Sequence, residues 1–140
     1  MRGVCTLDAL AAGIGEGFSA ERLAVLDGWR GEVFAALYGP DGERIWDPAI
    51  YRPEELAARF GELEGSPSVA GSGAVRFRHE LARDGVRVPD DSDPVHRVAA
   101  RHICALAALG GSEAGGLAPI YLRPPDAERW RERDASQRAQ

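Results

Sequence analysis

A glycine-rich turn, Gly71-Ser72-Gly73, is the stretch of this sequence whose residue types could hold a ligand. A β-rich run, Ser66 to Ala70, precedes the turn, and a helical pattern, Ala74 to Asp84, follows it. Unpaired backbone N–H groups in such a turn can bind a phosphate at the start of a helix. The same residues also suit a tight connection between a strand and a helix. We favour the tight connection and keep phosphate binding as the alternative.

The histidines and cysteines predict neither a metal centre nor a nucleophile. His79, His96 and His102 do not show the spacing of four residues that places two imidazoles on one helix face. We expect His102, which lies on an apolar helix face, to be a packed histidine. Cys5 and Cys104 lack a C-x-x-C spacing and a secretory context, which favours two buried thiols over a disulfide. The sequence therefore predicts no catalytic residue, no metal and no cofactor.

Three β-rich runs must position any such turn. They cover Leu23 to Leu26, Val33 to Tyr38 and Arg44 to Tyr51, and the residues between them are typical of tight turns. This order predicts three antiparallel strands. Both alternating sets of side chains in the middle run are apolar, so that strand needs cover on both faces and should lie inside the sheet.

Helical patterns flank these strands. We expect a helix over Thr6 to Ala12, capped by Thr6, ended by Gly13 and preceded by neither strand nor loop, and a second over Pro53 to Phe60. A third is expected over Ala74 to Asp84, with a short strand over Val86 to Val88. These elements together predict an α/β fold with a mixed sheet and packed helices.

The clearest helical pattern begins at Asp93-Pro94 and stops at Gly110-Gly111. Its apolar residues recur at helical spacing, which predicts one continuous helix with a buried stripe. The stripe consists of Val95, Val98, Ala99, His102, Ile103, Leu106 and Leu109.

The composition excludes several classes of protein. With 140 residues, of which 44% are hydrophobic and 28% charged, the chain is long enough for one domain with a substantial core. The net charge of -5 argues against direct nucleic-acid binding, and no apolar run is long enough to cross a membrane. We expect a single domain over residues 1–122, a charged tail over residues 123–140, and a cytoplasmic location.

Four stretches along the chain are similar to motifs of one protein family. Gly3 to Ala11, GVCTLDALA, matches that family's GVSTLDALA, and Leu26 to Phe34, LDGWRGEVF, resembles LDARRGEVY. Val69 to Ala74, VAGSGA, is similar to the turn VGDGA, and Tyr121 to Glu128, YLRPPDAE, to the closing YLRRPDAE. By these four stretches the chain resembles the TsaB (YeaZ) family, the non-catalytic branch of the glycoprotease-like (Gcp/Kae) proteins that make N6-threonylcarbamoyladenosine in tRNA.

The resemblance implies the C-terminal lobe of a two-lobed, ribonuclease H-like or actin-like (ASKHA) fold. In the family the first matched stretch follows a whole N-terminal lobe, so we expect a misassigned start codon or a truncated gene. In actin-like proteins the hairpin corner approaches nucleotide phosphates, which marks Asp27, Arg30 and the turn Gly71-Ser72-Gly73 as candidate phosphate contacts. In the structural alternative, which we favour, Asp27 caps its turn and Arg30 pairs with an acid. Trp29 and Ser72 depart from the family's pattern.

For function, the resemblance implies a scaffold for modification of adenosine 37 of tRNA. Such a protein pairs with the catalytic paralogue TsaD and recruits the ATPase TsaE. The alternatives are a glycoprotease-like metalloenzyme and a stand-alone phosphate- or nucleotide-binding module. If the first lobe is missing, we expect little binding to TsaD unless that lobe is supplied. We also expect self-association through the Thr6–Ala12 helix and the cleft-facing surface of the sheet.

Overall fold

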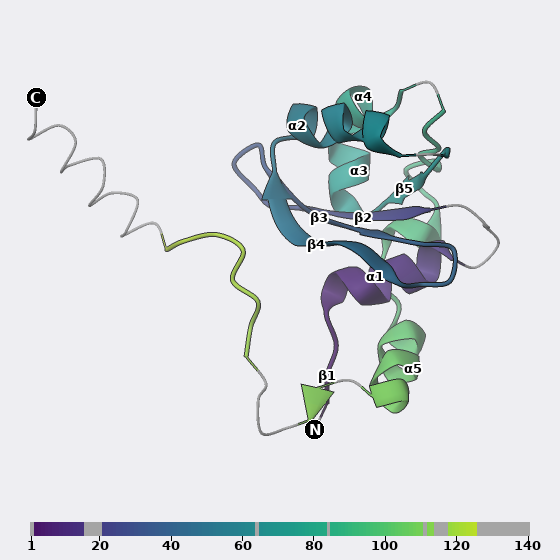
Figure 1. Cartoon of the computed structure of the whole chain (residues 1–140), viewed down its shortest axis with the longest axis vertical. Coiled ribbons are helices and arrows are strands. Elements are labelled where there is room, and N and C mark those ends of the chain that lie inside the picture. The colour runs from purple at the N-terminus through teal and green to yellow at the C-terminus, as the bar shows by residue number, and fades with distance from the viewer. Residues whose placement is uncertain are drawn as a thin grey trace, which may run out of the picture.

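The computed structural model describes residues 2–15, 21–63, 65–83, 85–110, 112–113 and 118–125. Its centre is a four-stranded mixed sheet with strand order β4-β3-β2-β5 (Figure 1). The strands are β2 (Arg22–Asp27), β3 (Val33–Tyr38), β4 (Arg44–Tyr51) and β5 (Ser68–Ala70). β3 is antiparallel to both neighbours, whereas β5 is parallel to β2. The three antiparallel strands predicted from the sequence are therefore confirmed.

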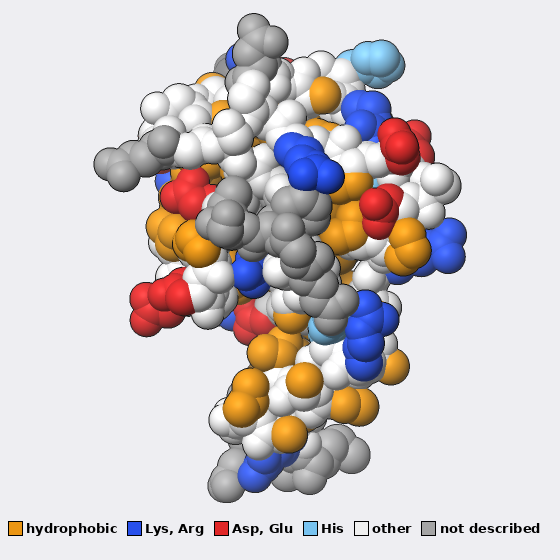
Figure 2. Space-filling view, turned by 90° about the vertical axis from the view of Figure 1, so that its right-hand side faces the viewer, with side chains coloured by type: hydrophobic (Ala, Val, Ile, Leu, Met, Phe, Trp, Pro, Cys, Tyr) orange, Lys and Arg blue, Asp and Glu red, His pale blue; other side chains and the backbone are white. Residues whose placement is uncertain are grey.

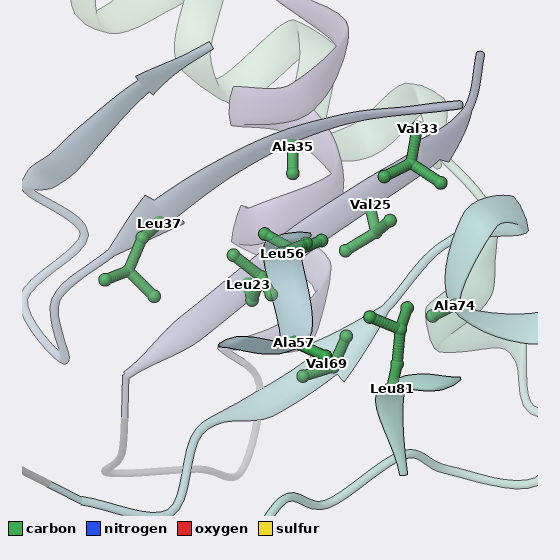
Figure 3. Packing of buried hydrophobic residues seen from close by; sticks show 10 residues of the cluster. All are labelled: Leu23, Val25, Val33, Ala35, Leu37, Leu56, Ala57, Val69, Ala74 and Leu81. Atoms are coloured by element: carbon green, nitrogen blue, oxygen red, sulfur yellow. The ribbon is translucent and has the colours of Figure 1, made fainter. Parts of the chain in front are cut away.

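β3 lies inside the sheet, as its two apolar faces predicted. Val33, Ala35 and Leu37 belong to a core cluster on one face, shown in Figure 3, whereas Ala36 and Tyr38 belong to a cluster on the other face. Both faces are covered by helices, so each alternating set of β3 side chains is removed from water.

Helices cover the two faces from different parts of the chain (Figure 1). α1 (Thr6–Ile14) packs on the face that carries Ala36 and Tyr38. α2 (Pro53–Ala58), α3 (Ser72–Arg76) and α4 (Arg78–Leu81) cover the opposite face. α2 continues as a 3-10 helix, Arg59–Glu62, which agrees with the helix predicted to Phe60.

The first helix begins at Thr6 as predicted, but its cap, its end and the lack of a preceding strand were predicted wrongly. A two-residue strand, β1 (Arg2–Gly3), leads into it and pairs with β6 (Ser112–Glu113). Cys5 occupies the cap position, and no side chain caps the helix. Gly13 does not end the helix, because it lies inside α1 where a Cβ would meet the imidazole of His102 at 3.4 Å.

Two further helices are broken where the sequence predicted continuous ones. Phe77 leaves helical geometry, with φ -110° and ψ 35°, and separates α3 from α4. Arg78 holds α4, the second of these two helices, in place. Its guanidinium donates to the carbonyl oxygen of Val88 at 3.1 Å and to the carboxylate of Asp91. These tertiary contacts override local helix propensity. The strand expected over 86–88 is reduced to a single bridge between Arg87 and Ser68.

The long helix expected from Asp93 is also divided. Asp93 caps only a 3-10 helix, Pro94–His96, and α5 begins later (Ala100–Gly110). Arg97 between them is extended. The chain bends there because the His96 ring is buried, while Val95 and Val98 pack on the α1 cluster.

The predicted stripe of α5 is not buried. His102 is the helix's buried residue, which confirms its expected packing. Ile103 is 42% exposed and Leu109 is 86% exposed. Cys5 and Cys104 are free thiols, the first half-buried and the second exposed, so the expected burial of Cys104 was wrong.

Candidate functional site

The β2–β3 corner, residues 27–32, has an unusual backbone. Trp29, Arg30 and Gly31 follow one another with φ of 60°, 57° and 78°, all in the left-handed region. That region is unfavourable for side chains other than glycine, so the fold must hold this turn in place. Two backbone bonds close it, from Gly28 N–H to the Glu32 carbonyl at 2.8 Å and from Glu32 N–H to the Trp29 carbonyl at 3.2 Å.

The carboxylate of Asp27 holds the start of the corner. One oxygen accepts the Trp29 N–H at 3.0 Å, which confirms the predicted turn cap. The other accepts a bond from the Arg76 guanidinium at 2.7 Å. The sequence did not predict this ion pair, because Arg76 stands on α3 and only the tertiary fold brings it to the corner.

The glycine-rich turn packs directly against the end of β2. Gly71 has φ 123°, and a Cβ there would lie 2.0 Å from the Val25 carbonyl oxygen. A Cβ on Gly73 would lie 2.9 Å from the Leu26 carbonyl carbon. Only glycine fits these close approaches, which confirms the tight strand–helix connection. The Ser72 hydroxyl accepts the Asp27 N–H at 3.0 Å and joins the turn to the corner.

The structure therefore gathers the candidate phosphate contacts in one region. Asp27 touches Ser72 directly, with Gly71 and Gly73 on either side, and Arg30 lies at the exposed tip of the same corner. The Gly71 N–H donates to the Nδ1 of buried His96 at 3.1 Å, so His96 occupies one of the turn's donors. Phosphate contact by these residues stays a prediction.

Arg123 braces the corner from the far end of the chain. Its guanidinium donates to the Gly28 carbonyl at 2.7 Å and forms an ion pair with Glu32. It also lies 5.8 Å from the centre of the Phe34 ring. Sequence reasoning assigned Arg123 to the tail, although it falls within the matched segment YLRPPDAE. The tail from residue 126 onward lies outside the described residues.

A second polar cluster, also missed from the sequence, ties α1 to the sheet. Asp8 accepts bonds from the Tyr38 hydroxyl and from the Arg44 guanidinium, both at 2.5 Å. The pKa of the Tyr38 hydroxyl is raised above its usual range, chiefly by burial and to a smaller extent by the hydrogen bond to Asp8. The hydrogen bond to Asp8 also raises the pKa of the Arg44 guanidinium, which therefore stays protonated.

An open pocket of about 840 Å³ lies beside this cluster. We call it the α5 groove, because residues of α5 and of the segment 118–122 are among those that line it. Its apolar lining includes Leu26 and Phe34 from the sheet, Leu106 and Leu109 from α5, and Ile120. Among the described residues no group of three or more His, Cys, Asp or Glu side chains could hold a metal ion. None of the described helices is long and apolar enough to span a membrane.

The fold is similar to that of YeaZ, with a mixed four-stranded sheet and helices packed against it, and this confirms the predicted α/β class. One similar structure is an uncharacterized protein from Pseudomonas aeruginosa with similarity to peptidase YeaZ. It has a TM-score of 0.64 and 23% identity, covering 86% of this chain and 57% of that one. Another is YeaZ from Pseudomonas aeruginosa, with a TM-score of 0.63 and 22% identity, covering 85% of this chain and 57% of that one. No protein-family model and no curated protein matches the chain. This chain thus spans 57% of the length of the structures that it resembles.

Proposed function

We propose that this chain is a non-catalytic, TsaB-type scaffold component in the synthesis of N6-threonylcarbamoyladenosine at position 37 of tRNA. Its role is to support the catalytic paralogue TsaD, with the ATPase TsaE as a further partner. The observation that carries the proposal is the likeness in fold to YeaZ over most of this chain. The four stretches that resemble the family by sequence fall in the same order along the chain.

The contacts at the corner support a structural role. Both carboxylate oxygens of Asp27 are engaged, one by the Trp29 N–H and one by Arg76. Arg123 is engaged by the Gly28 carbonyl and Glu32. A general base or nucleophile must be within reach of a substrate, whereas these groups serve the backbone of the corner. The corner therefore fits a rigid surface better than a reaction centre.

That rigid surface presents one large side chain to solvent. Trp29 is 70% exposed at the tip of the corner, on a backbone that Asp27 and Arg123 hold from two sides. A fixed aromatic side chain loses little freedom on binding and is a frequent anchor of protein interfaces. Within the proposed function, Trp29 is the described residue best placed to touch a partner protein.

The first experiment separates a scaffold from an enzyme. We expect the purified chain to show no ATP turnover, no peptidase activity and no tRNA modification on its own. Steady ATP turnover that disappears in Asp27→Ala would contradict the proposal. Asp47→Ala is the matched control, because it removes an exposed carboxylate from β4.

The second experiment tests the scaffold role itself. The matched part of Pseudomonas aeruginosa YeaZ is replaced by this chain, and the hybrid is added to TsaD and TsaE. We expect threonylcarbamoyl transfer to tRNA to depend on the hybrid, and Trp29→Ala to lower it without unfolding the protein. A folded hybrid that gives no transfer, while intact YeaZ does, would refute the scaffold role.

No contact among the described residues specifically supports either of the two alternative functions. A hydrolase needs a metal group or a paired nucleophile, and the described residues offer two unlinked thiols and no cluster of ligands. A phosphate-binding module would need the turn's donors, of which the Gly71 N–H is taken by His96. Nucleotide titration of the purified chain tests that module directly.

A further inference from the structure

Exposed apolar side chains are concentrated in one region of the molecule. Among the described residues six large hydrophobic side chains are exposed, and four of them belong to α5 or to residues 118–122. These four are Ile103, Leu109, Ile120 and Tyr121. Figure 2 shows hydrophobic side chains gathered over the projecting part of the molecule where α5 lies. Apolar surface that is gathered in this way marks a site where another surface binds.

The sequence of α5 is typical of a helix that is covered on several sides. From His102 to Gly110 it carries no Asp, Glu, Lys or Arg. Within the described part of the chain, however, His102 is its only buried residue. Leu109 lines the α5 groove and is 86% exposed. A helix that is apolar on most of its surface is normally buried, so the described residues supply only part of its cover.

The α5 groove also reaches an interior part of the sheet. Leu26 of β2 and Phe34 of β3 are cross-strand partners, and both line the groove. The next pair on the same sheet face, Ala24 and Ala36, is fully buried in the cluster that α1 covers. Leu26 and Phe34 are only half-buried. Because β2 and β3 are the two inner strands, the cover of this face is incomplete at the Leu26–Phe34 pair.

The charges that line the groove are neutralised within the chain. Asp8 and Arg44 are the charged residues of the lining, and they form an ion pair with each other at 2.5 Å. Asp8 also accepts the hydroxyl of Tyr38. A surface that fills the groove therefore needs apolar side chains and no charge of its own.

The similar structures contain more chain than the part that matches. This chain spans 57% of the length of YeaZ from Pseudomonas aeruginosa and 57% of its uncharacterized relative. A large part of each of those chains therefore lies outside the match. Side chains of inner strands are normally covered by other layers of the same fold. The open Leu26–Phe34 pair thus favours a part of the same fold over an unrelated partner.

We propose that the α5 groove binds the part of a YeaZ-like fold that lies outside this match. The occupant is a further polypeptide whose apolar side chains fill the space between α5, residues 118–122 and the Leu26–Phe34 pair. It covers Leu109 and completes the cover of the sheet face on which α1 packs. The inference rests on the likeness in fold and not on the proposed role in tRNA modification.

This location differs from the one expected from the sequence. The Thr6–Ala12 helix was expected to be left uncovered, but Leu7, Leu10 and Ala11 are buried against the sheet. Only the start of α1, from Thr6 to Asp8, lines the groove. Self-association through this helix stays a prediction.

Cysteine labelling measures whether the groove is covered. Leu109→Cys is made in a Cys5→Ser, Cys104→Ser background, both in this chain alone and in the hybrid in which this chain replaces the matched part of Pseudomonas aeruginosa YeaZ. The matched control is Ile45→Cys, at an exposed hydrophobic residue of β4 outside the groove. The same proteins without an introduced cysteine give the background rate of reaction with a maleimide.

In the chain alone we expect the two introduced cysteines to react at similar rates. In the hybrid Leu109→Cys should react at least about ten-fold more slowly, because a covered thiol reacts only when its cover opens. Ile45→Cys should change by less than about three-fold, because nothing new covers it. Circular dichroism verifies that each protein is folded.

Urea unfolding gives a second, independent measurement. Leu109→Glu should leave the midpoint of the chain alone nearly unchanged, because that side chain is 86% exposed. It should lower the midpoint of the hybrid, because it brings a charge into an apolar contact. Ile45→Glu should shift neither midpoint. Equal shifts of the chain and the hybrid by Leu109→Glu would contradict the proposed contact.

Equal labelling of Leu109→Cys in the chain and in the folded hybrid would overturn the proposal. Slow labelling in the chain alone would also overturn it, because the chain or a second copy would then already cover the groove. A hybrid that does not fold would mean that the groove does not accept the rest of the YeaZ fold. Slowed labelling in a hybrid without threonylcarbamoyl transfer would support the assigned occupant while refuting the proposed function.

Discussion

Replacing Gly71 by alanine should destabilise this fold more than adding a methyl group at any other described glycine. With φ 123° and ψ 173°, Gly71 occupies a backbone region that is essentially restricted to glycine and costs other residues about 1–3 kcal/mol. The added Cβ would also lie 2.0 Å from the Val25 carbonyl oxygen and 2.7 Å from Leu10, and such overpacking costs about 1–3 kcal/mol more. We therefore expect Gly71→Ala to lower the free energy of unfolding by about 2–6 kcal/mol. A single domain of this kind has only about 5–15 kcal/mol in total.

Urea unfolding followed by circular dichroism measures this loss, and two other glycines separate its causes. Gly42 has φ 88° with no atom within 4 Å of a Cβ, so Gly42→Ala reports backbone strain alone, about 1 kcal/mol. Gly61 has neither a positive φ nor a neighbour, so Gly61→Ala should be nearly neutral. If Gly71→Ala costs no more than Gly42→Ala, the turn does not press against β2 and the reasoning fails.

Three further predictions concern burial, charge and pH. Leu10→Ala should lower the free energy of unfolding by about 2–5 kcal/mol in urea, because Leu10 is fully buried, whereas Ile103→Ala should lower it by less than about 1 kcal/mol. Equal losses for the two variants would contradict the exposed position of Ile103. Arg123→Ala should lower the free energy of unfolding by about 1–3 kcal/mol, because it removes the bonds from Arg123 to the Gly28 carbonyl and to Glu32. A loss no larger than that of Arg83→Ala, at an exposed arginine, would contradict this role of Arg123. The pKa of Tyr38 is raised in the folded state, so its contribution is complete below about pH 10, where unfolded tyrosine begins to ionise, and is lost as the pH rises further. Unfolding midpoints at rising pH should thus fall less steeply for Tyr38→Phe than for the unmodified chain, and identical slopes would contradict the assigned burial.

The sheet could be predicted from the sequence because its signals are local. In β3 both alternating sets of side chains are apolar, which predicts that both faces of the strand are covered. The turn after Asp27 is capped by a residue only two positions away. The glycines of the β5–α3 turn predict that another backbone segment comes close, but they do not indicate which strand that segment belongs to.

The helices were harder because their limits depend on distant contacts. Helical periodicity groups Ile103 with Leu106 and Leu109, but it does not say whether a covering surface exists within the chain. The break before α5 depends on where His96 is buried, and His96 contacts Gly71, which lies 25 residues away.

The same limit applied to the candidate site. Asp27 and the glycine-rich turn were selected from the sequence and do meet, because β2 and β5 are neighbouring parallel strands. Arg76 and Arg123 were not selected. Arg123 reaches the Gly28 carbonyl across 95 residues, and no short-range pattern encodes such a pairing.

The guanidinium of Arg2 caps the end of α5 through the Ala107 carbonyl, across 105 residues of chain. Loop-closure entropy opposes so distant a contact until most of the chain is already ordered. The β2–β4 meander, by contrast, joins only neighbouring segments and can form early. Assembly should therefore proceed outward from the meander, with α5 docking last and opening first. In native-state hydrogen exchange, the amides of α5 should lose protection at lower opening energies than those of β3.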